Sequence, residues 1–119
     1  MVLPAVAAAE RLAKEGIRAS VFDARFVQPL DGDAIAELAT RCGRIVTVEE
    51  AVLAGGFGSA VLEMLAARNL PTPALRLGIP DILVPHGTRA QQLAGLGLTP
   101  DGLAKSVGAW VATTQPVLP

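Results

Sequence analysis

The sequence has little of what several kinds of site require. It contains one cysteine, one histidine, no tyrosine and 3% aromatic residues. A single cysteine excludes a disulfide framework and a metal site built from several thiolates, so a reducing, cytoplasmic compartment is the simplest expectation. We expect Cys42 to be a small buried residue near the end of a helix. The scarcity of aromatic rings argues against a surface on which nucleic-acid bases stack.

Long apolar runs and blocks of like charge are also missing. No apolar stretch approaches the roughly 20 residues of a membrane span, and the amino terminus lacks the basic region and apolar core of a signal peptide. Basic and acidic residues are interspersed and give a formal net charge of -1, which argues against an electrostatic nucleic-acid binder. We therefore expect neither nucleic acid nor a membrane as a partner.

What is present is a hydrophobic chain of 119 residues, 51% of them apolar. This length fits one domain, residues 1–119, with one core. Apolar periodicity, capping residues and the positions of glycine and proline mark the secondary structure. They predict helices at residues 4–14, 34–41, 60–68, 88–95 and 99–112, strands at residues 17–22, 45–48 and 74–77, and an irregular tail over residues 113–119.

The order of these elements predicts an α/β fold. Strands that alternate with helices form a parallel sheet with right-handed crossovers, covered by helices on both faces. Three short strands are few for so many helices, however, and the chain opens on a helix with no strand leading into it. We therefore expect a strand to be missing ahead of Pro4, and we interpret the chain as the end of a longer polypeptide.

The stretch from residue 44 to residue 67 organises the rest of the chain. A short β-branched run, residues 45–48, is followed by Glu49 and Glu50, then by a glycine loop and a helix. Ligands and partners meet open α/β sheets at the carboxyl ends of strands, so this loop is the first candidate site. Its residues are Gly55, Gly56, Phe57, Gly58 and Ser59.

Two functional interpretations of this stretch are considered, an acid–base pair and a phosphate site. Glu49 and Glu50 could be an acid–base pair, but neighbouring residues of a strand point to opposite sides and cannot share one proton. The favoured alternative is that one carboxylate bonds nearby backbone amides while the other is solvated or meets a partner.

The loop could cradle a phosphate at the helix start. The two carboxylates would repel it, and no Lys or Arg lies between Arg44 and Arg68, so a tight structural turn is favoured.

Arg25 and His86 are the remaining candidates. Arg25 follows a predicted strand and could bind an acidic partner, or it could pair with Asp23, with Asp31 or with another subunit. His86 could titrate near neutral pH, but a single histidine has no histidine partner for a metal site. A loop histidine that makes one hydrogen bond is the favoured interpretation.

Five short segments form a set that is specific together and weak singly: Ala24-Arg-Phe-Val-Gln-Pro-Leu-Asp31, Val46-Thr-Val-Glu-Glu50, Gly55-Gly-Phe-Gly-Ser59, Gly78-Ile-Pro-Asp81 and Pro85-His-Gly-Thr88. With this set, nearly the whole chain resembles the carboxyl-terminal domain of the 1-deoxy-D-xylulose-5-phosphate synthases, which are thiamine-diphosphate enzymes of the transketolase group. Gln28 departs from the family pattern, in which we expect a lysine.

The resemblance implies a three-layer α/β/α fold with a five-stranded mixed sheet. In the family an edge strand and a central strand precede the first helix of this chain. The central strand would lie between residues 19–22 and residues 45–48, so we expect a sheet that lacks its first strands.

The resemblance also implies a function for the whole enzyme. The family condenses pyruvate with glyceraldehyde 3-phosphate, with loss of CO2, and supplies isoprenoid, thiamine and pyridoxal synthesis. Its thiamine diphosphate and Mg2+ are bound by upstream domains, whose diphosphate motif this chain lacks. We therefore expect no catalytic, cofactor-binding or metal-binding residue here. We expect a transferase fragment that is inactive alone and that packs on its upstream domains and on a second subunit of a homodimer.

Two alternatives remain. The chain could end a related thiamine enzyme, such as a transketolase or a pyruvate dehydrogenase β subunit, or it could be a free-standing α/β module that binds a nucleotide or a phosphorylated ligand. Under all of these readings the candidate structural or interface residues are Glu49, Glu50, Gly55, Gly56, Phe57, Gly58, Ser59, Arg25 and His86.

Overall fold

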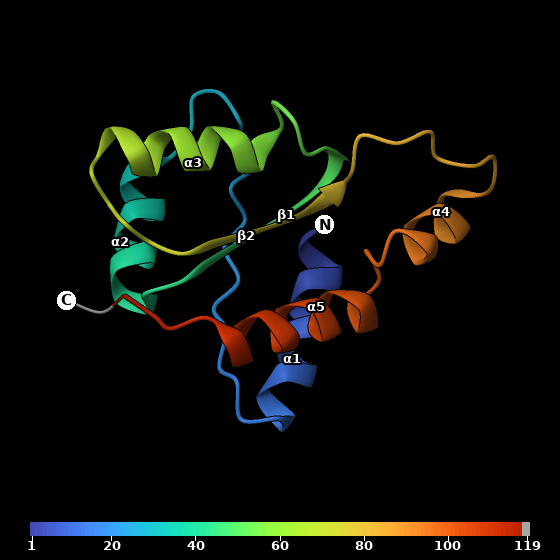
Figure 1. Cartoon of the computed structure of the whole chain (residues 1–119), viewed down its shortest axis with the longest axis horizontal. Coiled ribbons are helices and arrows are strands. Elements are labelled where there is room, and N and C mark those ends of the chain that lie inside the picture. Colours follow the sequence, from blue (N-terminus) through green and yellow to red (C-terminus); the bar gives the residue numbers. More distant parts are fainter. Residues whose placement is uncertain (118–119) are drawn as a thin grey trace.

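The computed structural model describes residues 1–117, in which helices lie on both faces of a small parallel sheet (Figure 1). The α/β class expected from the sequence is confirmed. In chain order the elements are α1 (Val2–Lys14), α2 (Gly32–Cys42), β1 (Ile45–Val52), α3 (Phe57–Ala67), β2 (Ala74–Ile79), α4 (Arg89–Gly95) and α5 (Pro100–Thr113).

The helix ends follow the capping signals of the sequence. Asp31 caps α2, because its carboxylate accepts a hydrogen bond from the Ala34 amide at 3.1 Å. Thr88 begins α4 in a capping box with Gln91, and Thr99 caps α5 ahead of a proline in its first turn. Each of these side chains satisfies amides that a helix start leaves without an intrahelical partner.

The sheet consists, over residues 1–117, of β1 and β2 in parallel, connected through α3. Ile45 pairs with Ala74 and Val48 with Leu77, but the next pair is Val52 with Ile79. β1 therefore carries two more residues than β2 across this irregularity. The extra residues belong to the stretch that follows Val48, where the two neighbouring glutamates lie.

The predicted strand at residues 17–22 is wrong. These residues are irregular, and all but Ile17 are exposed. A strand requires a neighbour that accepts and donates its backbone hydrogen bonds, and the described structure offers none beside this segment. The apolar residues Val21 and Phe22 accordingly remain 41% and 42% exposed.

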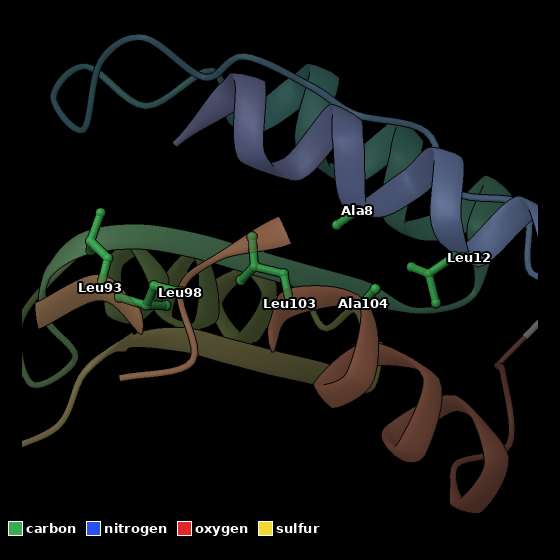
Figure 2. Packing of buried hydrophobic residues seen from close by; sticks show 6 residues of the cluster. All are labelled: Ala8, Leu12, Leu93, Leu98, Leu103 and Ala104. Atoms are coloured by element: carbon green, nitrogen blue, oxygen red, sulfur yellow. The ribbon is translucent and has the colours of Figure 1, made fainter. Parts of the chain in front are cut away.

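Two apolar clusters lie on opposite faces of the sheet. One joins α1, α4 and α5, and Figure 2 shows its buried members between these helices and the sheet. The other lies between the sheet and the pair α2 and α3, where Ala39 and Val61 are almost fully buried. The members of the first are Ala8, Leu12, Leu93, Leu98, Leu103 and Ala104; those of the second are Ile35, Ala39, Val61 and Leu65.

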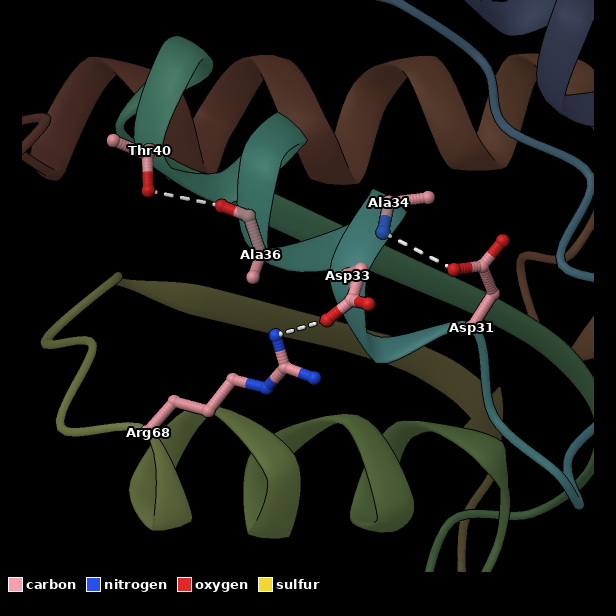
Figure 3. Close-up of polar contacts among 6 residues, drawn as sticks. All are labelled: Asp31, Asp33, Ala34, Ala36, Thr40 and Arg68. Atoms are coloured by element: carbon pink, nitrogen blue, oxygen red, sulfur yellow. Dashed lines mark hydrogen bonds and ion pairs between the residues drawn. The ribbon is translucent and has the colours of Figure 1, made fainter.

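An ion pair also links α2 and α3. Arg68, which follows the last turn of α3, places its guanidinium 2.7 Å from the carboxylate of Asp33 in the first turn of α2 (Figure 3). An acidic residue at a helix start interacts favourably with the helix dipole. Both side chains are substantially exposed, so the pair orients the helices more than it stabilises them.

The end of the chain crosses the amino end of β1. The Val117 amide donates to the Gly43 carbonyl oxygen at 3.0 Å, and the Arg44 guanidinium donates to the Thr114 carbonyl oxygen. Of the predicted tail, residues 114–117 are not helical, Thr113 is the last residue of α5, and residues 118 and 119 lie outside the described part.

Cys42 ends α2 as expected but is exposed rather than buried. It faces an open groove, which is described below, so no packed neighbour covers it. Among residues 1–117, no helix combines the length and the apolar character that crossing a membrane requires.

Candidate functional site

Glu49 binds the start of α3. One of its carboxylate oxygens accepts the Phe57 amide at 2.7 Å and the other accepts the Gly58 amide at 2.9 Å. Glu49 lies near the carboxyl end of β1 and is only 6% exposed. The carboxylate thus fills the anion-binding position that a helix start creates through its free amides and its dipole.

Glycines make the room for this carboxylate. A Cβ on Gly56 would overlap Glu49 Oε2 and would lie 2.6 Å from the Val52 carbonyl oxygen. A Cβ on Gly58 would lie 2.6 Å from Thr47 Oγ1 and 2.9 Å from Arg76 Cδ. Gly55 instead provides a left-handed conformation, with φ of 71°. The glycine loop therefore brings the backbone and one acidic side chain into direct contact.

Arg76 completes the loop, although it belongs to β2. Its Nη1 atom donates to Ser59 Oγ and to the Leu53 carbonyl oxygen, both at 3.0 Å. Ser59 Oγ in turn donates to the Leu53 carbonyl oxygen and accepts the Gly55 amide. The sequence does not predict this contact, because Arg76 lies far from the loop along the chain. The parallel register, which sets Arg76 opposite Thr47, brings it there.

This arrangement does not fit a phosphate or diphosphate group. Two amides at the start of α3 are already bonded to Glu49, and Arg76 is bonded to the loop itself. The described residues also contain no group of three or more His, Cys, Asp or Glu side chains that could hold a metal ion. The loop therefore orders the backbone through bonds within the chain.

Glu50 points away from Glu49 and pairs with α4. Its two oxygens accept the Arg89 Nε and Nη2 atoms at 2.6 and 2.5 Å. The hydrogen bonds and charge of Arg89 lower the pKa of Glu50, and Glu50 raises the pKa of Arg89. The neighbouring carboxylates thus have separate partners, as the alternation of a strand requires. Nothing local in the sequence marks Arg89 as the partner.

The two other candidates lie apart from this network. Arg25 has a left-handed backbone, with φ of 55°, and its guanidinium lies 3.6 Å from Asp23. Of the two carboxylates considered from the sequence, Asp23 is the one that Arg25 approaches. His86 is exposed in the loop between β2 and α4. The structure therefore brings together Glu49 and the glycine loop, whereas Arg25 and His86 make no hydrogen bond or ion pair with that loop.

A groove of about 500 Å3 runs beside β1, on the side away from β2. We call this side of β1 its open edge. The groove has apolar walls from both helical layers and from the irregular segment that follows α1. Its principal lining comes from Ala5, Ala9, Leu12, residues 17–27, Ile35, Leu38, residues 45–49, Val107 and Trp110.

Backbone groups of β1 point into this groove. The Ile45 amide donates to the Pro73 carbonyl oxygen, on the β2 side. Because successive residues of a strand direct their amides and carbonyls to opposite edges, those of Val46 and Val48 face the open edge. Unpaired backbone groups beside apolar walls are costly. The groove therefore suits a single added strand, which would satisfy these groups and cover the walls.

Comparisons with known proteins agree with the fold. The family model described as "Transketolase, C-terminal domain" matches residues 1–103. The 1-deoxy-D-xylulose-5-phosphate synthase of Synechocystis sp. is 50% identical over 115 residues, 97% of this chain and 18% of that protein. The synthase of Cyanothece sp. is 53% identical over 98% of this chain and 18% of that protein.

A solved structure is also similar. The chain of a "Split gene transketolase, inactive beta4 tetramer" superposes with a TM-score of 0.83 at 34% identity, covering 91% of this chain and 35% of that one. The chain spans less than a fifth of the length of the curated relatives given above. The family match extends over most of the sequence, and the architecture agrees with it. The chain belongs to the transketolase carboxyl-terminal domain family.

Proposed function

We propose that the chain is the carboxyl-terminal part of a 1-deoxy-D-xylulose-5-phosphate synthase and that it serves in assembly. The identity of 50–53% to synthases over 97–98% of the chain supports the enzyme. The whole enzyme would condense pyruvate with glyceraldehyde 3-phosphate, with loss of CO2, as a cytoplasmic homodimer. Thiamine diphosphate and Mg2+ would be held by the part of the enzyme that lies outside this chain.

The observation that carries the assembly role is the groove at the open edge of β1. It exposes backbone groups of Val46 and Val48 and apolar walls from two layers. Five residues of β1, 45–49, line it, a length of roughly 16 Å in a strand. In our proposal one strand from upstream in the polypeptide fills the groove and joins this domain to the catalytic body.

A chimera tests the function. In the Synechocystis enzyme, the matched region of 115 residues is replaced by this chain. We expect turnover of pyruvate and glyceraldehyde 3-phosphate with thiamine diphosphate and Mg2+. We expect none from the same enzyme without the region, or from the chain alone. A folded chimera without turnover, or clear turnover by the chain alone, would contradict the proposal.

Amide exchange tests the groove in the same pair of proteins. The Val46 and Val48 amides should exchange rapidly in the chain alone and slowly in the chimera, because an added strand accepts their hydrogen bonds. The Ile45 amide, which is bonded to Pro73, should be protected in both. Equal exchange of Val46 and Val48 in the two proteins would count against a strand in the groove.

A further inference from the structure

Arg44 is the residue that precedes β1, and its guanidinium is incompletely paired. The residue is half-buried and lines the groove. One nitrogen donates to the Thr114 carbonyl oxygen, but Nε is buried and meets no acceptor among residues 1–117. None of the ion pairs formed within these residues includes Arg44. Because a guanidinium that leaves water without an ionic partner is costly, the missing partner is expected from outside this part of the chain.

Two other side-chain atoms of residues 1–117 are buried without a hydrogen-bond partner, Arg11 Nη1 and Thr47 Oγ1. Arg11 already forms an ion pair with Asp101 at 3.0 Å. Thr47 is uncharged, and its hydroxyl lies against α3, where a Cβ on Gly58 would be 2.6 Å away. Of the three residues, Arg44 is therefore the one that combines an unpaired charge with a place beside the groove.

The charged side chains that line the groove leave a positive surplus. Arg25 is paired with Asp23 at 3.6 Å, and both carboxylate oxygens of Glu49 are bonded to amides of α3. The other charged side chains of the lining are those of Arg18 and Arg44. Arg18 is exposed, so water solvates its charge, whereas Arg44 is half-buried. A segment with a carboxylate near Arg44 would complement this surplus, and a second cation there would be repelled.

Resting on the strand proposed above for the groove, we propose that this strand carries an aspartate or glutamate that pairs with Arg44. A strand paired with β1 lies about 4.8 Å from it, so a side chain on the same face reaches the guanidinium. Opposite charges on adjacent strands stabilise their pairing. Arg44 thereby determines which segment the groove accepts: one that is apolar along the walls and acidic at the end beside the amino terminus of β1.

A tethered strand tests this pair. An extended segment of about six residues, apolar except for one Glu at its first or its last position, is joined to Met1 by a flexible Gly–Ser linker. Both positions are needed, because a parallel strand places its first residue beside Arg44 and an antiparallel strand its last. Each segment has a matched form with Gln in place of Glu. The measurement is amide exchange of Val46 and Val48, which a strand in the groove slows.

For one of the two positions, exchange of Val46 and Val48 should be about fivefold slower in the Glu form than in the Gln form, as expected of a partly exposed ion pair. Arg44→Gln should abolish this difference. Arg18→Gln is the matched control, because it removes the exposed arginine of the same groove, and it should leave the difference in place.

Equal exchange of the Glu and Gln forms at both positions would overturn the inference, and so would a difference that survives Arg44→Gln. If no segment slows exchange relative to the chain alone, the strand in the groove is itself wrong, and the proposed assembly role fails together with the ion pair. That outcome is recognised before the Glu and Gln forms are compared.

Discussion

The sequence predicts a strand both at residues 17–22 and at residues 45–48, but only the second run forms one. Each begins with an isoleucine and follows a helix after a short turn. Residues 45–52 form β1, with β2 on one side and the loop-bound Glu49 near the end. Residues 17–22 line the groove, and none of residues 1–117 forms a strand beside them. The difference teaches that β structure is a property of pairs of segments, so propensity alone cannot assign it.

The largest expected loss of stability comes from placing a side chain at Gly58, where α3 packs closely on β1 and β2. In Gly58→Val the new side chain would begin 2.6 Å from Thr47 Oγ1 and 2.9 Å from Arg76 Cδ. We expect a loss of about 3 kcal/mol in the free energy of unfolding, measured with denaturant. Gly95→Ala is the control, because a Cβ there would meet no atom within 4 Å beyond its chain neighbours and its own helix backbone, and it should be neutral or slightly stabilising. Equal stability of the two variants would contradict the close contact.

The next effect concerns the carboxylate at the start of α3. Glu49→Ala leaves the Phe57 and Gly58 amides without their acceptor, and we expect a loss of about 2–3 kcal/mol in denaturant unfolding. Glu49→Gln retains one side-chain acceptor oxygen and should lose less. Glu63→Ala, at an exposed position of α3, should change little. If Glu49→Ala were as stable as Glu63→Ala, the cap would be dispensable.

A smaller effect is expected in the unpaired run. Phe22→Ala should cost about 1 kcal/mol in the chain alone, because the residue is 42% exposed there. Leu65→Ala, at 3% exposure in the α2–α3 cluster, should cost about 2–5 kcal/mol. A cost for Phe22 close to that of Leu65 would mean that residues 17–22 are packed in solution, and the contrast with β1 would fail.

The smallest expected effect is the pH dependence of the stability contributed by the Glu50–Arg89 pair. The pKa of Glu50 is lowered in the folded chain, chiefly by the Arg89 hydrogen bonds. The pair therefore contributes stability above the unfolded carboxyl pKa of about 4.3, and this contribution is lost as the pH falls through the folded pKa. The gap in denaturation midpoint between the native chain and Arg89→Gln should shrink from pH 6 to pH 3. A gap that is constant with pH would contradict the pair.

The sequence predicts well wherever the cause of a feature is local. Thr88 and Thr99 cap the last two helices as their capping signals predict, whereas α2 begins at Gly32, two residues earlier than predicted. The sequence also predicts that one of the two neighbouring glutamates bonds nearby amides, and the structure shows that it is Glu49. The partners Arg76 and Arg89 could not be found, because the register of β2 and the return of α4 bring them in from outside the loop. The strand predicted at residues 17–22 is wrong because, among residues 1–117, no strand lies beside this segment to pair with it.

The irregularity in β1 has a consequence for how its length can change. β1 advances four residues from Val48 to Val52 while β2 advances two from Leu77 to Ile79. The excess is an even number, so Val48 and Val52 keep the same face and Glu49 and Glu50 keep opposite ones. An inserted or deleted pair of residues would preserve this phase. A single one would exchange the two carboxylates between the sides of the sheet and direct the wrong one at α3.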